Sequence, residues 1–420
     1  RLLLGDSLYA IRLLPALAGA TVVFLAALMT RKLGGRAFAQ SLAALAVVTA
    51  PVLLGQGKFF TMNSFDFLFW ALAGYVLLMI LIDDRSTLWL ALGGIVGLGL
   101  LNKYSIGFMV IGLVAGLLLT KQRKQLAAKW FWLGAVLAGA LFLPHVIWQV
   151  SNAFPSLEFM RNASQNKNVS LGAVGFFMGQ LMEMNIFNAP LWIAGIVYFF
   201  REERLRPLAW MYPAVFVVMI AGNAKVYYLA AIYPLFLAGG SVAFEGWFNN
   251  FHWGWPRHAL MTSMIVYAVV ALPFALPVLP VEQFIQYEQL LGLAPRAEER
   301  NPVAELPQYY ADEFGWEEMV ATIADAYKRL TPQEQSECVI YVRNYGEAGA
   351  IDFYGSRHDL PKATCGHNNY WIWGPGTRTG NIAIIIGVSN DLQRSFADLR
   401  RGYTSVEHVG TTNAKYAMPF

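Results

Sequence analysis

The pattern of hydrophobic and polar positions divides the chain into two parts. Up to about residue 280, long apolar runs alternate with short charged loops. From residue 281 onward, apolar and charged residues are mixed as in a soluble domain. The change comes near "ALPFALPVLPVEQF", a stretch with three prolines. We therefore predict a polytopic helical transmembrane domain over 1–280 and a soluble domain over 281–420.

The apolar runs predict transmembrane helices, because a helix needs about 20 apolar residues to cross a bilayer. The candidate spans are 12–30, 38–56, 65–82, 130–150, 171–200, 208–222, 226–246 and 259–280. The run over 88–119 is ambiguous. As a single helix it would be about 48 Å long, which exceeds a hydrocarbon core of about 30 Å. As two helices, each would be short.

The distribution of basic loops decides how the ambiguous run is read, because loops rich in Lys and Arg stay on the cytoplasmic side. The basic loops cover residues 31–36, 83–85, 121–129 and 201–206. All four share one side only if 88–119 is a hairpin of two short helices. We therefore predict ten spans that begin and end outside, with the tip of the hairpin, Asn102–Lys103, also outside.

Composition supports a membrane protein and excludes several other classes. Hydrophobic residues make up 56% of the 420 residues and charged residues only 14%, against about 25% charged in soluble domains. The net charge of +4 and the absence of a basic, aromatic-rich block do not indicate nucleic-acid binding. The two cysteines form no metal-binding motif. Because the chain begins with Arg1, we interpret it as a fragment that lacks its N-terminus.

The predicted outward connections collect charged residues near the membrane boundary. The cations are Lys58, Lys103, Arg161, Lys167 and Lys225, and the acids are Asp66 and Glu158. Such a set suits the binding of an anionic lipid headgroup.

Each of these residues also has a purely structural interpretation. Lys58 and Lys167 could extend to water beside the membrane, and Lys103 could pair with a buried acid. Asp66 could cap a helix. Glu158 and Arg161, three positions apart, could pair with each other. The sequence leaves these alternatives open.

Several separated motifs resemble a known family. They are "TMNSFDFLFWALAGYVLL", "GLGLLNKYS", "LPHVIWQ", "FPSLEFMRNAS" and "KVYYLAAIYPLFLAGG", with "YADEFGWEEMV", "RNYGEAGAIDFYG" and "GHNNYWIWGPG" nearer the C-terminus. Together they resemble the bacterial protein-mannosyltransferase-like enzymes of glycosyltransferase family 39. The resemblance implies the C-type glycosyltransferase fold and a bacterial inner-membrane enzyme. That enzyme would transfer a hexose such as mannose, with inversion, from a polyprenyl-phosphate donor to a glycan, lipid or protein acceptor outside.

The resemblance also implies roles for individual residues. Lys103, Lys225 and Arg161 are expected at the donor phosphate, and Tyr104, Glu158, Tyr227 and Tyr228 are expected to line the cavity. Asp66 matches an outer-face acid that could assist catalysis or metal binding. The catalytic base is expected upstream of Arg1, so Asp6 is not that base. A divalent metal is compatible with this family resemblance but not required by it.

The region 281–420 predicts a small α/β domain, because strand-like runs in "ECVIYVRN" and "NIAIIIGV" alternate with helix-like runs. The turn "NYGEAG" could bind a phosphate or sugar through helix N-terminal amides, or could be a plain strand-to-helix turn. His367, Asn368 and Trp371 are candidate glycan contacts. A Cys338–Cys365 disulfide is a further hypothesis in an oxidising compartment.

Two other functions compete with a glycosyltransferase. A transporter or flippase of lipid-linked sugars predicts internal repeats and broken helices near the midplane, and no repeat is visible. A non-catalytic membrane scaffold predicts that Lys103, Lys225 and Asp66 can be replaced without loss of function. The sequence identifies neither the sugar nor the acceptor.

Overall fold

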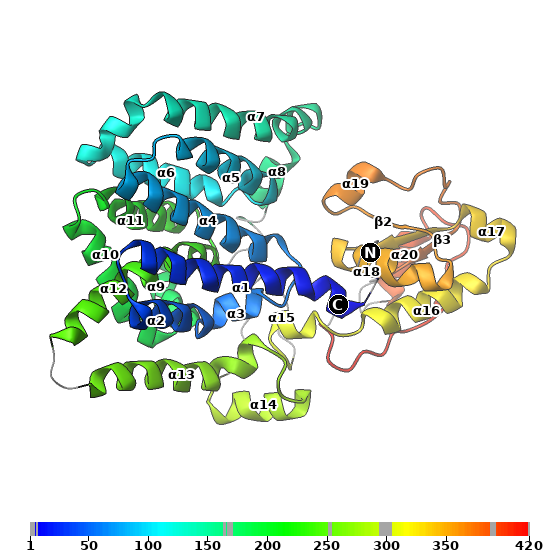
Figure 1. Cartoon of the computed structure of the whole chain (residues 1–420). Coiled ribbons are helices and arrows are strands. Elements are labelled where there is room, and N and C mark those ends of the chain that lie inside the picture. Colours follow the sequence, from blue (N-terminus) through cyan, green and yellow to red (C-terminus); the bar gives the residue numbers. More distant parts are fainter. Residues whose placement is uncertain are drawn as a thin grey trace. The chain divides into compact units, whose positions relative to one another are not determined.

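The computed structural model describes residues 5, 7–162, 165, 171–250, 254–293, 305–386 and 392–418. Two compact units make up the fold (Figure 1). The helical unit comprises Arg1–Phe154 and Asn168–Phe284, and the C-terminal unit comprises Pro155–Lys167 and Ile285–Phe420. Asp6 and Lys167 lie outside the described residues.

The helical unit consists of apolar helices joined by short connections. Its α-helices are α1 (Leu8–Lys32), α2 (Ala37–Val48), α3 (Pro51–Gln56), α4 (Met62–Asp83), α5 (Leu88–Asn102), α6 (Ile106–Leu118), α7 (Lys129–Ser151), α9 (Gly172–Glu183), α10 (Ala189–Arg201), α11 (Arg206–Ala221), α12 (Tyr233–Asn249) and α13 (Trp255–Ala275). Its 3-10 helices are η1 (Lys121–Ala127), η3 (Ile186–Asn188) and η4 (Val226–Ile232). The predicted mainly helical fold is confirmed.

Five helices among the described residues are long and apolar enough to cross a membrane, so the chain is a multi-pass membrane protein. They are Leu8–Lys32, Met62–Asp83, Lys129–Ser151, Val226–Asn249 and Trp255–Ala275. Shorter apolar helices lie between them, at Ala37–Val48, Ser86–Asn102, Ile186–Arg201 and Arg206–Ala221. The count of ten spans stays a prediction.

Two of the predicted spans are wrong as continuous helices. The span 38–56 is divided into α2 and α3, because Pro51 has no N–H to continue the hydrogen-bond ladder and instead begins α3. The span 171–200 is divided near Asn185, whose φ of 71° is left-handed and cannot continue a right-handed helix.

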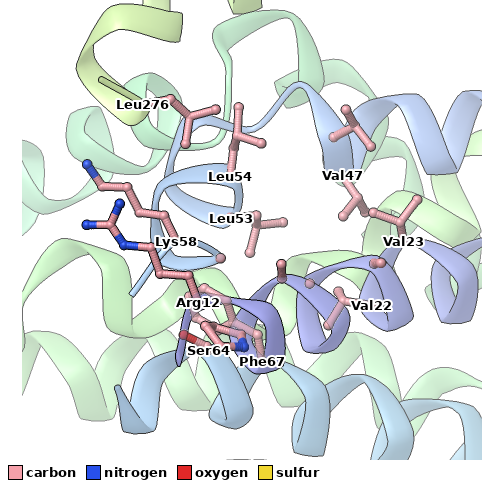
Figure 2. A pocket seen from close by; sticks show the side chains of 16 residues that line it. Arg12, Val22, Val23, Val47, Leu53, Leu54, Lys58, Ser64, Phe67 and Leu276 are labelled. Atoms are coloured by element: carbon pink, nitrogen blue, oxygen red, sulfur yellow. The ribbon is translucent and has the colours of Figure 1, made fainter. Parts of the chain in front are cut away.

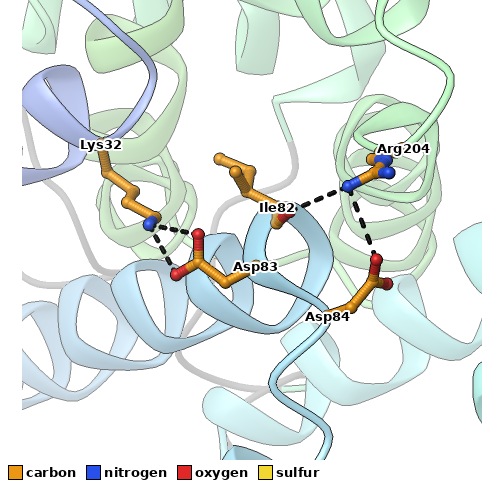
Figure 3. A network of polar contacts seen from close by, with 5 residues as sticks. All are labelled: Lys32, Ile82, Asp83, Asp84 and Arg204. Carbon is orange, nitrogen blue, oxygen red and sulfur yellow. Dashed lines mark hydrogen bonds and ion pairs between the residues drawn. The ribbon is translucent and has the colours of Figure 1, made fainter.

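The ambiguous run 88–119 forms two helices, α5 and α6, with Lys103–Ser105 between them. The basic loops meet at one end of the helical unit, which we call the basic end. The ion pairs that join these loops, two of which appear in Figure 3, are Lys32–Asp83, Arg204–Asp84 and Lys121–Glu203. The prediction that all four loops share one side is therefore confirmed. The opposite end, where α4 begins, we call the site end.

Small residues allow the helices of this unit to pack closely. A Cβ added to Gly93 of α5 would lie 2.1 Å from the carbonyl oxygen of Gly134 in α7. A Cβ on Gly240 of α12 would lie 1.8 Å from the carbonyl oxygen of Leu191 in α10. Glycine at such contacts is typical of helix pairs in membranes, where close van der Waals packing replaces the hydrophobic effect.

The C-terminal unit contains a parallel three-stranded sheet. Its strands are β1 (Val339–Val342), β2 (Ala363–Cys365) and β3 (Ala383–Ile385), in the order β2-β1-β3. Its helices are α8 (Pro155–Asn162), α15 (Gln308–Ala311), α16 (Trp316–Lys328), α17 (Pro332–Glu337), α18 (Tyr345–Tyr354), η5 (Gly355–His358), α19 (Asn369–Trp373) and α20 (Leu392–Leu399). Helix α14 (Val281–Leu290) spans the boundary of the two units. The predicted α/β character is present, although β2 was not expected.

The two cysteines are buried free thiols. Cys365 lies opposite Val342 in the β1–β2 register, whereas Cys338 precedes the other end of β1. The disulfide hypothesis is wrong because this register keeps the two sulfurs at opposite ends of the strand.

Candidate functional site

The first turn of α4 is the centre of the site end. Thr61 caps this helix, and its hydroxyl accepts a hydrogen bond from the amide of Asn63. Asp66 lies one turn further on and its side chain is only 1% exposed. Asp66 is therefore not the helix cap that its position suggested, and its carboxylate needs partners inside the protein.

Those partners come from the tip between α5 and α6. The Nζ of Lys103 lies 3.4 Å from Oδ2 of Asp66 and donates a 2.8 Å hydrogen bond to Oδ1 of Asn63. The hydroxyl of Ser105 donates to Oδ1 of Asp66. Lys103 is 9% exposed, so this is a buried ion pair. Of the two interpretations of Lys103, the structure shows the pair with a buried acid.

Two aromatic rings complete the surroundings of Lys103. Its Nζ lies 4.1 Å from the ring centroid of Tyr228 and 5.6 Å from that of Tyr227, both in η4. Cation–π contacts of this kind gain strength when they are shielded from water. The ammonium group is thus held by an acid, an amide and an aromatic face, which together fix the tip against α4 and η4.

A second group of contacts holds the same tip against α7. The hydroxyl of Tyr104 is hydrogen-bonded to Nε2 of His145, and the side-chain amide of Gln149 donates to the Tyr104 hydroxyl at 3.3 Å. Tyr104, predicted to line a cavity, therefore connects the hairpin tip to the end of α7.

A cavity of about 440 Å³ lies in the helical unit beside the first turn of α4. Its lining residues are Arg12, Pro15, Ala16, Gly19, Ala20, Val22, Val23, Val47, Val48, Leu53, Leu54, Gly57, Lys58, Ser64, Phe67 and Leu276. The side chains of Arg12 and Lys58 extend toward the same end of this cavity, and valine and leucine side chains line the rest (Figure 2). The cavity thus combines a cationic end with an apolar body.

Ser64 couples the cavity to α4. Its hydroxyl lies 2.7 Å from both the carbonyl oxygen of Gln56 and that of Phe59, which bracket Lys58. The first turn of α4 therefore has two roles. Ser64 and Phe67 contact the cavity, while Asn63 and Asp66 contact Lys103.

The remaining predicted residues of the donor site are more scattered. Lys225 stands at the N-cap position of η4, a segment held by a 2.8 Å hydrogen bond from Gln180 to the carbonyl of Val226. Glu158 and Arg161 are exposed on α8 of the C-terminal unit, and no ion pair joins these two described residues. The alternative in which these two side chains pair with each other is therefore not the one seen, and their roles in the cavity stay predictions.

The "NYGEAG" turn of the C-terminal unit uses its amides internally. The side chain of Asn344 accepts hydrogen bonds from the amides of Gly346 and Glu347 at 2.8 and 3.0 Å. The carboxylate of Glu347 accepts from the amide of Arg343. The interpretation as a plain strand-to-helix turn therefore fits the structure better than a phosphate site.

The candidate glycan contacts lie together near α19. The ring of His367 packs edge-on against Tyr345, with centroids 5.0 Å apart. Asn368 precedes α19 with a φ of 55°, and Trp371 is exposed. Their predicted role in glycan binding is not tested by this geometry.

Sequence reasoning missed Arg12 as a site residue, because it stands at the edge of a predicted span. Its position inside the apolar run "LYAIRLLPALAG" was the available signal. Within the described ranges, no group of three or more His, Cys, Asp or Glu side chains is placed to hold a metal ion.

Comparisons with known proteins agree with the observed fold. Residues 1–148 match the sequence profile of the dolichyl-phosphate-mannose-protein mannosyltransferase family, which confirms the resemblance over that part. No curated protein matches the chain. The crystal structure of ArnT from Cupriavidus metallidurans in the apo state is 18% identical, with a TM-score of 0.57, over 94% of this chain and 77% of ArnT. The same enzyme bound to undecaprenyl phosphate is 16% identical, also with a TM-score of 0.57, over 98% and 85%. The chain therefore shares the fold of ArnT.

Proposed function

Because residues 1–148 carry the signature of the dolichyl-phosphate-mannose-protein mannosyltransferase family, we propose that this membrane protein is a glycosyltransferase that takes its sugar from a polyprenyl-phosphate donor. The observation that carries this proposal is the cavity with two cations at one end and an apolar body. A polyprenyl phosphate has matching chemistry, with an anionic head and an isoprenoid tail. Such a lipid is bound in one of the ArnT structures that share this fold.

Arg12 and Lys58 are the residues that we assign to the phosphate. When the bond between sugar and phosphate breaks, negative charge develops on the departing lipid phosphate. Fixed cations in a low-dielectric site stabilise that charge strongly. A guanidinium can also make two parallel hydrogen bonds to phosphate oxygens, which orients the leaving group.

Lys103 and Asp66 act differently in this proposal. Their charges neutralise each other inside the protein, and they fix the first turn of α4 that carries Ser64. We assign them a positioning role, with Asp66 as a structural acid rather than the base that activates the acceptor hydroxyl. The assignment of Lys225 and Arg161 to the phosphate stays a prediction, as do mannose as the sugar and the outer face of the bacterial inner membrane as the location.

The test measures binding of undecaprenyl phosphate to the purified protein in lipid nanodiscs. Replacing Arg12 or Lys58 by glutamine removes a charge-assisted hydrogen bond worth about 1.5–3 kcal/mol, so each variant should bind roughly 10- to 100-fold more weakly. Lys32→Gln, at the basic end, is the matched control and should bind normally. Unchanged binding in both Arg12→Gln and Lys58→Gln would refute the assigned phosphate site.

A second measurement addresses the transfer reaction. The protein is incubated with radiolabelled polyprenyl-phosphate mannose and with donors that carry other sugars, and release of the free lipid phosphate is followed. A glycosyltransferase releases lipid phosphate when an acceptor is supplied. A flippase instead moves the intact donor across the bilayer without releasing it, and this outcome would overturn the proposal.

A further inference from the structure

The C-terminal unit carries a short helical turn whose large apolar side chains are exposed. In α19, Trp371 is 75% exposed, Ile372 is 42% exposed and Trp373 is 65% exposed. Three successive exposed residues of this size are unusual in a soluble domain, because contiguous apolar patches are normally small unless they are functional.

The turn is held in place by the residue that precedes it. The hydroxyl of Tyr370 donates a 3.0 Å hydrogen bond to Oδ2 of Asp352 in α18, and the same carboxylate accepts from the amide of Ala363 in β2 through Oδ1. Left-handed residues stand on both sides of the turn, Asn368 with a φ of 55° and Gly374 with a φ of 63°. The exposed turn is therefore an ordered part of the unit that projects next to the sheet, and the hydrogen bond of Tyr370 to Asp352 holds it in place.

The arrangement of the three side chains favours one kind of partner. Successive residues of a helix point about 100° apart, so Trp371, Ile372 and Trp373 extend in three directions around the turn. A sugar ring stacks on one flat aromatic face, whereas a bilayer interface surrounds a projecting tip on all sides. Tryptophan is also enriched at membrane interfaces, where its ring is buried and its N–H stays hydrated.

The sequence around the turn and its connectivity point to the same partner. Residues 360–390 contain no Asp or Glu, so this stretch places no carboxylate that an anionic membrane surface would repel. Both oxygens of the neighbouring Asp352 are hydrogen-bonded within the unit, to Tyr370 and to Ala363. The chain itself crosses the membrane, and the apolar helix α13 ends at Ala275, shortly before the C-terminal unit begins. We propose that the tip formed by Trp371, Ile372 and Trp373 inserts into the interfacial layer of the bilayer and holds the C-terminal unit at the membrane surface.

The experiment places a fluorophore that responds to polarity at Trp371→Cys in the full chain, reconstituted into nanodiscs that contain anionic lipid. Cys338 and Cys365 are buried, so they react little with the label. Gln333→Cys on α17 is the matched control, since this residue is exposed on another helix of the same unit. The measurement is repeated with lipids that carry a shallow nitroxide quencher, and with soluble mannose oligosaccharide.

The proposal expects a blue-shifted emission at position 371 and loss of most of its intensity with the nitroxide lipids, while position 333 remains water-like. An unshifted, unquenched label at position 371 would overturn it. A shifted label that the lipids do not quench would also overturn it, because that result places the tip against protein. If the emission at position 371 shifts to the blue only when the oligosaccharide is added, and the nitroxide lipids do not quench it, the tip would be a glycan site instead.

Discussion

The ion pairs at the two ends of the helical unit differ in how far water reaches them. At the basic end, the pairs Lys121–Glu203 and Arg204–Asp84 are exposed, and Lys32–Asp83 is only partly covered. At the site end, the pair Lys103–Asp66 is 9% and 1% exposed and is surrounded by an amide, a hydroxyl and aromatic rings.

This difference distinguishes two groups of charges. The exposed pairs lie in the basic loops that predict membrane topology, whereas the buried pair holds the residues of the candidate site in place. Exposed ion pairs contribute little to stability, because water screens them and ordering long side chains costs entropy. A buried pair has a desolvation cost that its own attraction often fails to offset. Such a pair is a weak source of stability, so we interpret its place at the start of α4, next to the cavity residues Ser64 and Phe67, as a means of holding that turn in position.

The largest expected effect comes from breaking the buried pair on one side. Asp66→Ala leaves the Lys103 ammonium without its acid and should destabilise the protein by about 3–5 kcal/mol. Thermal unfolding in detergent micelles measures this loss. The double variant Asp66→Ala/Lys103→Met removes both charges and should recover part of the stability.

The same pair of variants distinguishes the two roles of Lys103. If Lys103 only positions α4, the double variant that recovers stability should also recover most of its binding of undecaprenyl phosphate. If the double variant is stable but does not bind the lipid, Lys103 contacts the phosphate directly, as the resemblance to family 39 predicts.

A smaller effect is expected for the hydroxyl that joins α4 to the cavity. Ser64→Ala removes the hydroxyl whose single proton is shared between the carbonyl oxygens of Gln56 and Phe59, a hydrogen bond with a net contribution of about 0.5–1.5 kcal/mol. Unfolding should show a modest loss of stability, and the affinity for undecaprenyl phosphate should decrease more than the stability loss alone explains. Thr49→Ala, which removes a hydrogen bond to Leu45 within one helix turn, is the control and should leave lipid affinity unchanged.

Several of these features could be predicted from the sequence, for physical reasons. The positive-inside rule, which depends only on composition, placed the basic loops together on one side, and that placement predicted the two-helix hairpin over 88–119 that the structure shows. The polar interruptions "NKYS" and "TMNSFD" stood out in apolar surroundings and identified the end where the site lies.

Pairing between distant residues could not be predicted in the same way. Lys103 and Asp66 are 37 positions apart, and the contact depends on how α4, α5 and α6 pack. Arg12 looked like the edge of a span, because its role depends on a cavity formed by α1, α2, α3 and α4. The breaks at Pro51 and Asn185 lie within apolar runs whose hydropathy does not change.

Glu245, a buried carboxylate at the basic end, tests whether burial alone indicates function. The carboxylate of Glu245 in α12 accepts hydrogen bonds from the amides of Arg36 and Ala39, at 2.8 and 3.1 Å, and so caps the start of α2. Glu245→Gln weakens this cap and should cost about 0.5–2 kcal/mol in unfolding free energy. Lipid binding and sugar transfer, measured below the unfolding temperature, should stay normal. Reduced transfer in a fully folded variant would show that the basic end also takes part in function.

The smallest loss of stability is expected for the exposed ion pair Lys32–Asp83, which can be compared directly with the buried pair Lys103–Asp66. Lys32 and Asp83 form an ion pair as short as 2.6 Å, yet their side chains are 24% and 30% exposed. A double-mutant cycle with Lys32→Ala and Asp83→Ala should therefore give a coupling energy of only about 0.2–1 kcal/mol, and it should decrease in high salt. The same cycle for Lys103 and Asp66 should give a larger value that salt hardly changes. Equal coupling energies at the two ends would mean that burial does not separate these pairs, and the distinction between topological and site-building charges would be lost.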